Sequence, residues 1–241
     1  MPGAPFFSWS LSMPICVSLF DESGNMLRPW AEAGYTCHCF DLEGTARKEV
    51  LTTGSITYHK ADVTSPEIQA FILSLKPYFL FGFPPCTDVA VSGAKHFETK
   101  ARNNPYNQVE AAELAFIIPK VGAQSEAIWA FENPMSMLKH YFGNPDYIFH
   151  PWEFGGYLPE NDIHPRWPEY IAPRDAYPKE TWLWASSSFN FPPKAPVYCS
   201  SRYSEQFLKL GGKSAKTKQI RSETPRGFAK AVFMANRKGD F

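Results

Sequence analysis

Short apolar segments that alternate with helical patterns constrain the fold of this chain more strongly than any other feature of its sequence. The apolar segments have the length and the β-branched or aromatic content of buried strands. The strands are expected at 15–20, 35–40, 55–58, 78–83 and 127–131, and the helices at 26–33, 66–75, 106–121 and 225–236. Strands and helices that alternate at this spacing predict an α/β fold with a mostly parallel, Rossmann-like sheet.

Individual residues at the helix ends refine this expectation. Ser65 and Thr224 are expected to cap the helices that follow them, with Pro225 at the first position of the last helix. Pro119 lies inside the third helical pattern and should bend or end that helix. The segment between the fourth strand and the third helix is expected to be a polar loop.

The length of 241 residues suits one large domain with a modest insertion. Many of the 22 prolines follow residue 140, which indicates long irregular connections there. We therefore expect a regular core over 1–140 and a small irregular lobe over 141–216, with a short strand at 181–184. Residues 217–241 should form a C-terminal helix that returns to the core.

Three of the expected strands end in polar residues, namely Asp41, Cys86 and Glu132. In parallel sheets, ligands bind at the carboxyl ends of the strands. Cys86 follows two prolines, which fix the backbone and suit a nucleophilic thiol held on a rigid turn. Taken alone, such a cysteine is more often a buried structural thiol, and such a glutamate is more often a capping or surface residue. Their joint placement at strand ends favours a shared catalytic site.

The order of these motifs resembles that of the cytosine C5 DNA methyltransferases, in the short form common in bacteriophages. The resemblance extends over most of the chain. Its motifs are, in chain order, residues 19–24, Asp41, Asp62, residues 83–86 and 91–94, residues 131–134 and residues 224–229. It implies a methyltransferase fold in which 1–140 binds the cofactor and carries the catalytic groups, while 141–216 is the target-recognition lobe.

The resemblance also implies a role for each matching residue, with S-adenosylmethionine as the cofactor. Cys86 would add to C6 of cytosine, because C5 is not nucleophilic enough to attack the methyl donor directly. Glu132 would interact with N3 of the ring. The expected cofactor-binding residues are Phe20, Asp21, Ser23, Gly24, Asn25, Asp41, Asp62, Pro84, Pro225 and Phe228.

The sequence departs from the family pattern in two places. The first loop of the family has two or three glycines, whereas here Asp21 and Glu22 precede the single Gly24. The family's later arginine motif, which supplies a cation to the cytosine O2, has no clean copy. Lys179 is the best replacement for its first arginine, and a surface lysine before a strand is an equally good interpretation of this residue.

The C-terminal part of the chain is basic although the net charge is zero. Residues 200–238 contain ten basic and two acidic side chains, and such a segment can bind phosphates or simply form a solvated surface. The expected nucleic-acid contacts are Lys213, Lys216, Lys218 and Arg221. The five cysteines show no paired spacing, so neither a metal site nor a disulfide framework is expected.

The sequence leaves three functions open. The first is methylation of cytosine in DNA, and the second is the same chemistry on a free nucleotide such as deoxycytidine monophosphate, or on RNA. The third is a catalytically weak nucleic-acid-binding protein that keeps the fold. We expect a cytoplasmic monomer with no membrane segment, in the host cytoplasm if a phage encodes it.

Overall fold

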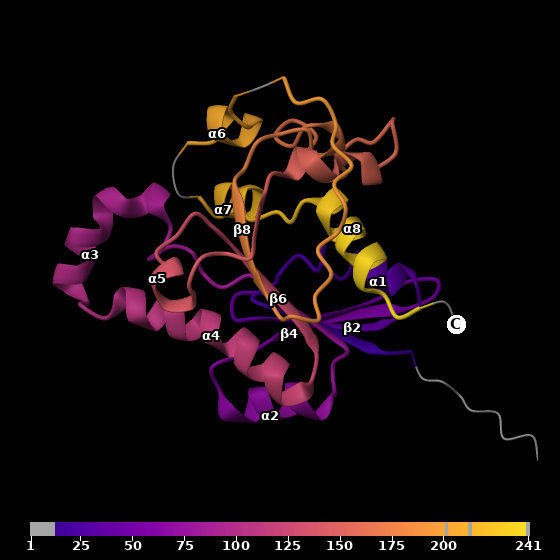
Figure 1. Ribbon diagram of the computed structural model, residues 1–241, viewed down its shortest axis with the longest axis horizontal. Coiled ribbons are helices and arrows are strands. Elements are labelled where there is room, and N and C mark those ends of the chain that lie inside the picture. Colours follow the sequence, from indigo (N-terminus) through magenta and orange to yellow (C-terminus); the bar gives the residue numbers. More distant parts are fainter. Residues whose placement is uncertain (1–12, 201, 212–213, 240–241) are drawn as a thin grey trace, which may run out of the picture.

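The computed structural model describes residues 13–200, 202–211 and 214–239, which form one eight-stranded sheet with helices on both faces (Figure 1). The order of the strands across the sheet is β3-β4-β2-β1-β5-β6-β8-β7. Their bounds are β1 Ile15–Leu19, β2 Thr36–Asp41, β3 Arg47–Val50, β4 Ser55–Lys60, β5 Phe79–Gly82, β6 Ile128–Pro134, β7 Tyr147–Phe149 and β8 Thr181–Ala185.

The five central strands are parallel, whereas β3 and β8 run antiparallel to their neighbours β4 and β6. The chain order reverses between β1 and β5, because β2 and β4 lie on one side of β1 while β5 and β6 lie on the other. This arrangement is compatible with a Rossmann-like fold and confirms the α/β class with a mostly parallel sheet. It also creates a switch point, where such sheets bind ligands.

Alternating side chains divide the core into two layers. On β1, Cys16 packs with Trp30 of α1 and Phe228 of α8, while Val17 and Leu19 pack with residues of α2 and α4. The helices are α1 Arg28–Glu32, α2 Pro66–Ser74, α3 Phe97–Asn103, α4 Asn107–Ser125, α5 Lys139–Phe142, α6 Glu205–Lys209, α7 Ala215–Arg221 and α8 Arg226–Asn236. Among the described residues, no helix is both long and apolar enough to cross a lipid bilayer.

The helix ends agree with the sequence expectations only in part. The Ser65 side chain caps α2 by accepting a hydrogen bond from the Ile68 N–H, as expected. The expected Thr224 cap is wrong, because α8 begins one residue later, with Pro225 at the cap position, and Thr224 is buried. Of the two effects expected of Pro119, a bend or the end of the helix, the second is wrong. The helix α4 continues to Ser125, since burial of the turns on either side outweighs one lost backbone hydrogen bond.

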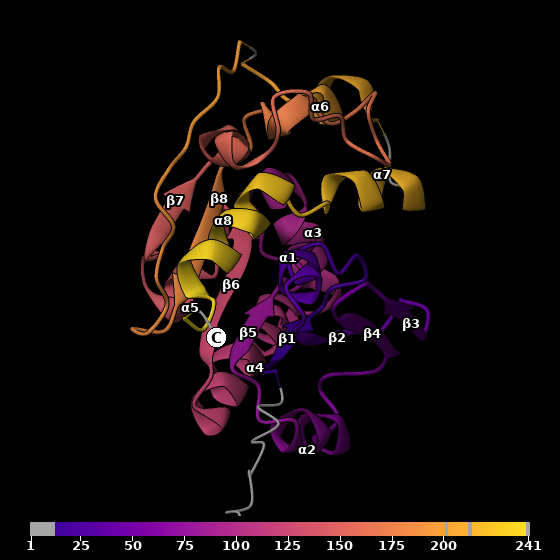
Figure 2. The ribbon, with the colours of Figure 1, turned by 90° about the vertical axis from the view of Figure 1, so that its right-hand side faces the viewer.

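The segment 141–216 is less separate from the core than its composition indicates. It contributes β7 and β8 to the central sheet. Its irregular parts, with α6, lie at the end of the molecule opposite to α2 in both views (Figures 1 and 2). The expected polar loop before α4 contains a 3-10 helix over Val91–His96 and the helix α3.

The C-terminal helix α8 joins the irregular segment to the core. Arg226 forms two hydrogen bonds to the Asp162 carboxylate, at 2.9 and 2.7 Å. A Cβ at Gly227 would lie 2.5 Å from the Phe154 carbonyl oxygen, so only glycine permits this close approach. Phe228 and Val232 of α8 also belong to the buried cluster that contains Cys16 and Trp30.

Candidate active site

The register of the sheet brings the ends of four strands into one row. Phe40, Leu19, Gly82 and Phe131 are consecutive partners across β2, β1, β5 and β6. The residue that follows each of them lies at the carboxyl edge of the parallel pairing. These residues are Asp41, Phe20, Phe83 and Glu132, although Glu132 still belongs to β6 and pairs with Leu183 of β8. Two of the three strand-end residues singled out in the sequence therefore lie in this row, and Cys86 follows three residues after Phe83.

The turn that carries Cys86 is held from both sides. The Phe83 N–H donates to the Leu19 carbonyl at 3.0 Å, and the buried Asn133 side chain donates to the Pro84 carbonyl at 3.0 Å. The Cys86 carbonyl accepts the N–H groups of the residues three and four positions later, at 3.2 and 2.8 Å. Cys86 is exposed, whereas Cys16, Cys37 and Cys39 are buried in the core. The thiol is therefore accessible on a turn with little freedom to move.

The chain after Cys86 is also fixed to the exit of β6. The Val91 N–H donates to the Met135 carbonyl at 2.9 Å, and the Met137 N–H donates to the Val89 carbonyl at 2.8 Å. Lys100 of α3 contacts this turn through the Thr87 carbonyl at 2.6 Å and the Asp88 carboxylate at 2.8 Å. The Cys86 turn and the Glu132 strand thus form one hydrogen-bonded unit.

Glu132 holds its carboxyl group in the protein interior. Burial raises its pKa, while the nearby Lys179 ammonium acts in the opposite direction. Among the described residues, the Oε2 atom of Glu132 has no hydrogen-bond partner. Buried polar atoms are nearly always paired, so an unpaired carboxyl oxygen is typical of a site that awaits a ligand.

Lys179 reaches this site because β8 runs antiparallel to β6. Thr181 pairs with Pro134 across the two strands, and Lys179 lies two residues before Thr181 on the same face. Its Nζ donates to the Arg221 carbonyl at 3.1 Å. A small pocket joins these groups to α8. Its lining residues are Phe83, Glu132, Phe149, Lys179, Thr181, Thr224, Pro225 and Phe228.

The charges of this site act directly on the Cys86 thiol. The surrounding protein and the Glu132 carboxylate raise the pKa of Cys86, whereas Lys179 and Lys100 lower it. The net effect is a raised pKa. The thiol is therefore protonated at neutral pH, and it must lose its proton before it can act as a nucleophile.

The loop after β1 is organised by Asp21 instead of by several glycines. The Oδ1 atom of Asp21 accepts hydrogen bonds from the N–H groups of Ser23 and Gly24 and from the Ser23 hydroxyl, and Oδ2 accepts from the Ser18 hydroxyl. Asp21 is thus buried inside the loop, where it cannot face a ligand as the sequence predicts. Phe20 has a φ of 56°, a strained value for a residue other than glycine, which indicates a loop shape fixed by its surroundings.

Two carboxylates near this loop suit the ribose and adenine groups of S-adenosylmethionine. Asp41 accepts the Glu43 and Gly44 N–H groups through Oδ1 alone, which leaves Oδ2 for ribose hydroxyls. Asp62 is exposed and its Oδ1 accepts from Thr64, so Oδ2 is left for an amino group. Asp41 and Asp62 lie at the carboxyl ends of β2 and β4, on one side of the switch point between β1 and β5.

The other residues expected to bind the cofactor are Gly24 and Asn25 in the loop after β1, and Pro225 and Phe228 at the start of α8. Gly24 has a φ of 71°, and a Cβ there would lie 2.4 Å from the Tyr58 hydroxyl. Asn25 donates to the buried Glu223 at 2.5 Å, and Trp167 donates to the other oxygen of Glu223 at 3.2 Å. Pro225 and Phe228 lie beside Glu132 and Lys179. Asn25 is therefore tied to the irregular segment.

The basic segment is largely engaged within the protein. Lys218 forms an ion pair with Glu43 at 2.6 Å, and Arg221 donates to the Leu210 carbonyl at 2.6 Å. Lys216 lies over the rings of Trp167 and Tyr170. Lys213 lies outside the described residues. The three described residues all lie on α7, and each has an intramolecular partner.

Sequence reasoning missed the residues that complete the site. Asn133 anchors the Cys86 turn, although the sequence indicated only that it would shape the backbone after Glu132. Phe149, Thr181 and Thr224 line the pocket beside Glu132. Thr181 and Thr224 carried a signal, since each precedes or begins a predicted element, but the contact between those elements is not visible in the sequence.

Comparison of the chain with known protein families and with curated proteins gives no match. The description of the fold and of the site therefore rests on the structure alone.

The described part of the chain contains no group of three or more His, Cys, Asp or Glu side chains that could bind a metal ion.

Proposed function

We propose that this chain transfers a methyl group from S-adenosylmethionine to C5 of cytosine in DNA, with Cys86 as the covalent nucleophile. One observation carries the proposal. Glu132, whose Oε2 atom has no partner among the described residues, and Lys179 line one pocket, and the Cys86 turn is hydrogen-bonded to the part of β6 that carries Glu132. These are the three groups that covalent activation of a pyrimidine requires.

The proposed chemistry assigns one step to each side chain. The Cys86 thiolate forms a bond to C6, and the electron density displaced from the ring moves toward N3 and O2. Burial raises the pKa of Glu132, which favours the protonated carboxyl group that would donate to N3. The Lys179 ammonium stabilises the negative charge that develops near O2. S-adenosylmethionine, when bound, would supply the methyl group to C5 and leave as S-adenosylhomocysteine. Water would then accept the C5 proton, N3 would return its proton to Glu132, and the bond between sulfur and C6 would break to release the Cys86 thiolate.

The exposure of Cys86 supports a macromolecular substrate. A base within a duplex cannot reach a thiol at the bottom of a closed cavity unless it is flipped into the site. The turn 84–86 is accessible, and the lysines Lys95 and Lys100 lie on the elements that follow it. A cytosine rotated out of DNA could therefore meet Cys86 without a large movement of the protein.

A free nucleotide is the second candidate, and one observation favours it. Lys216, Lys218 and Arg221 all have partners inside the protein, which leaves fewer cations for a DNA backbone than the sequence indicates. Incubation with labelled cofactor and either duplex DNA or deoxycytidine monophosphate separates the two substrates. Label in DNA supports the proposal, and label in the nucleotide alone replaces it with the second candidate.

Covalent trapping tests the mechanism itself. DNA that contains 5-fluorocytosine should form a denaturation-resistant complex with the protein in the presence of S-adenosylmethionine, because fluorine at C5 blocks release of the thiol. The complex should be absent with Cys86→Ser and present with Cys199→Ser, a matched change of another cysteine that is not buried in the core. If the wild-type protein forms no complex with cofactor present, the proposed mechanism is wrong.

A further inference from the structure

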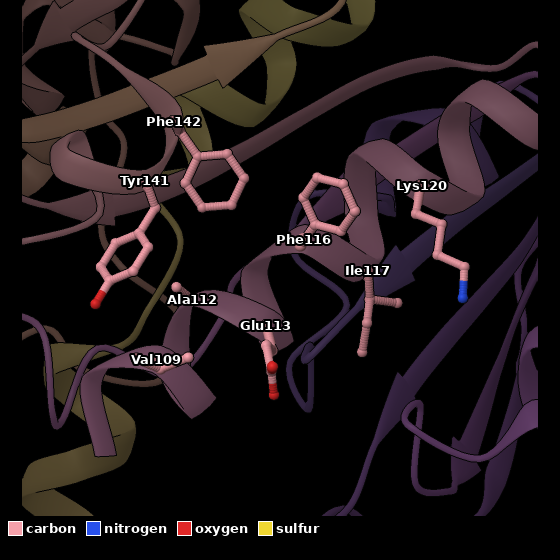
Figure 3. Close-up of a pocket in the computed structure, with 8 residues that line it drawn as sticks. All are labelled: Val109, Ala112, Glu113, Phe116, Ile117, Lys120, Tyr141 and Phe142. Carbon is pink, nitrogen blue, oxygen red and sulfur yellow. The ribbon is translucent and has the colours of Figure 1, made fainter. Parts of the chain in front are cut away.

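A groove beside α4 has a volume of about 350 Å³. It lies between α4 and α5 (Figure 3). Its lining residues are Val109, Ala112, Glu113, Phe116, Ile117, Lys120, Tyr141 and Phe142. Six of these eight side chains are apolar or aromatic without charge, and the two charged ones both come from α4.

The groove exists because the connection from β6 to β7 is short. The crossover contains only α5, a helix of four residues, where a parallel sheet is normally covered by a helix of several turns. Phe142 of α5 packs against Phe131 and Phe116, and the flank of α4 beyond it is left open. Phe116 is 57% exposed, Tyr141 is 47% exposed and Val109 is 40% exposed. Single exposed apolar side chains are common, but a group of them around a groove is typical of a docking surface.

The sequence of α4 is complementary to itself across this groove. Phe116 is the middle residue of the helix Asn107–Ser125, and Glu113 and Lys120 lie nearly symmetrically on either side of it. The spacing of seven residues places both charges on the face that lines the groove, about 10.5 Å apart along the axis. Two copies of α4 in antiparallel contact about Phe116 would set each Glu113 opposite the partner's Lys120.

We infer that this face of α4 binds a second copy of the chain to form a two-fold symmetric dimer. The partner's Phe116 would enter the groove among Phe116, Tyr141 and Phe142, and the two Glu113–Lys120 pairs would fix the antiparallel direction. Lys120 donates to Gln69 at 3.0 Å, and its ammonium has further N–H groups for the carboxylate. A partner for this face needs an apolar helix with an acidic and a basic residue seven positions apart. A second copy of α4, running antiparallel, supplies both. A dimer differs from the monomer that the sequence leads us to expect.

Sedimentation velocity on the full chain over a range of concentrations tests the inference. The wild-type protein should sediment as a concentration-dependent dimer. Glu113→Lys and Lys120→Glu should each weaken the dimer at least about tenfold, because each places like charges opposite one another twice. The double variant Glu113→Lys with Lys120→Glu should restore dimerisation, since it exchanges the charges and keeps the pairs.

A matched change of another exposed apolar residue controls for general effects. Phe116→Ser should abolish the dimer, whereas Val50→Thr on β3, at the far edge of the sheet, should leave it intact. Circular dichroism verifies that every variant is folded. A monomeric wild-type protein at all concentrations overturns the inference, and so does a dimer that neither single charge reversal weakens. Methyl transfer is not measured in this experiment, so its outcome is independent of the proposed function.

Discussion

The Glu132 carboxylate raises the pKa of the Cys86 thiol, and the Lys179 ammonium lowers the pKa of both groups. Removing the charge of Glu132 and removing the charge of Lys179 should therefore move the pKa of the Cys86 thiol in opposite directions. Glu132→Gln removes a negative charge and should lower the pKa of Cys86, while Lys179→Met removes a positive charge and should raise it. The rate of alkylation by iodoacetamide as a function of pH measures both shifts, in a Cys199→Ser background. Equal profiles for all three proteins would mean that the charges do not act on the thiol.

Glu132 should also limit the stability of the folded protein. Its pKa is raised by burial, so the folded state binds a proton that the unfolded state releases, and stability falls as the pH rises above the unfolded value of 4.5. Glu132→Gln removes this loss and should raise the melting temperature at pH 7 to 8 by roughly 2–8 °C, for a gain of about 1–2 kcal/mol. Near pH 4 the two proteins should melt together. A variant that is less stable than the wild type at pH 8 would contradict this account.

The sequence identified the candidate nucleophile and acid because their chemistry depends on residue type and on position at strand ends. It could not show that Asn133 reaches the Pro84 carbonyl or that Thr224 lines the pocket, since those contacts join segments 49 or more residues apart. Asp21 is a different case. Its position in the sequence suggested a ligand contact, whereas in the structure its buried carboxylate accepts hydrogen bonds from its own loop.

At the scale of single elements, the loop after β1 gives a direct test of cofactor binding. Asp21→Ala removes four hydrogen bonds and leaves buried N–H groups without an acceptor, which costs about 1–3 kcal/mol for each buried group. The affinity for S-adenosylhomocysteine, measured by calorimetry, should fall at least about tenfold. Glu22→Ala changes an exposed neighbour in the same loop and should bind nearly as the wild type does. Equal affinities for the two variants would remove this loop from the cofactor site.

The strands and long helices could be predicted from the sequence because burial and period determine them locally. The run 78–83 needed no other part of the chain to be recognised as a strand. Within the segment 141–216, the strand expected at 181–184 is confirmed as β8, whereas β7 was not expected from the sequence. Strands β7 and β8 are short, and they are stable only because the edge of β6 pairs with β8. Pro119 is a similar case, since packing around it overrides its local preference.

At the scale of the whole molecule, two buried groups between α8 and the irregular segment should offset each other in acid. Burial and Arg226 lower the pKa of His164 from 6.5 to about 4, so the protein loses stability from this group as the pH falls from 6.5 to 4. Burial raises the pKa of Asp175 from 3.8 to about 6, so the folded state gains stability from this group as the pH falls from 6 to 3.8.

Two variants separate these contributions. Relative to the wild type, His164→Asn should gain stability as the pH falls from 6.5 to 4, and Asp175→Asn should lose stability over nearly the same interval. Urea denaturation at several pH values measures the differences. The Asn side chain can still accept hydrogen bonds where His164 accepts them from the Arg166 and Trp167 N–H groups. Parallel curves for the wild type and both variants would show that neither group titrates differently on folding.

The raised pKa of the exposed Cys86 has a consequence for the lifetime of the protein. Peroxide and other oxidants attack the thiolate, and the neutral thiol reacts far more slowly. An accessible cysteine that remains protonated until a substrate arrives is therefore protected from oxidation to sulfenic and sulfinic acids. The raised pKa that keeps Cys86 protonated therefore also slows its oxidation. The protein can keep this cysteine at its surface between encounters with its substrate.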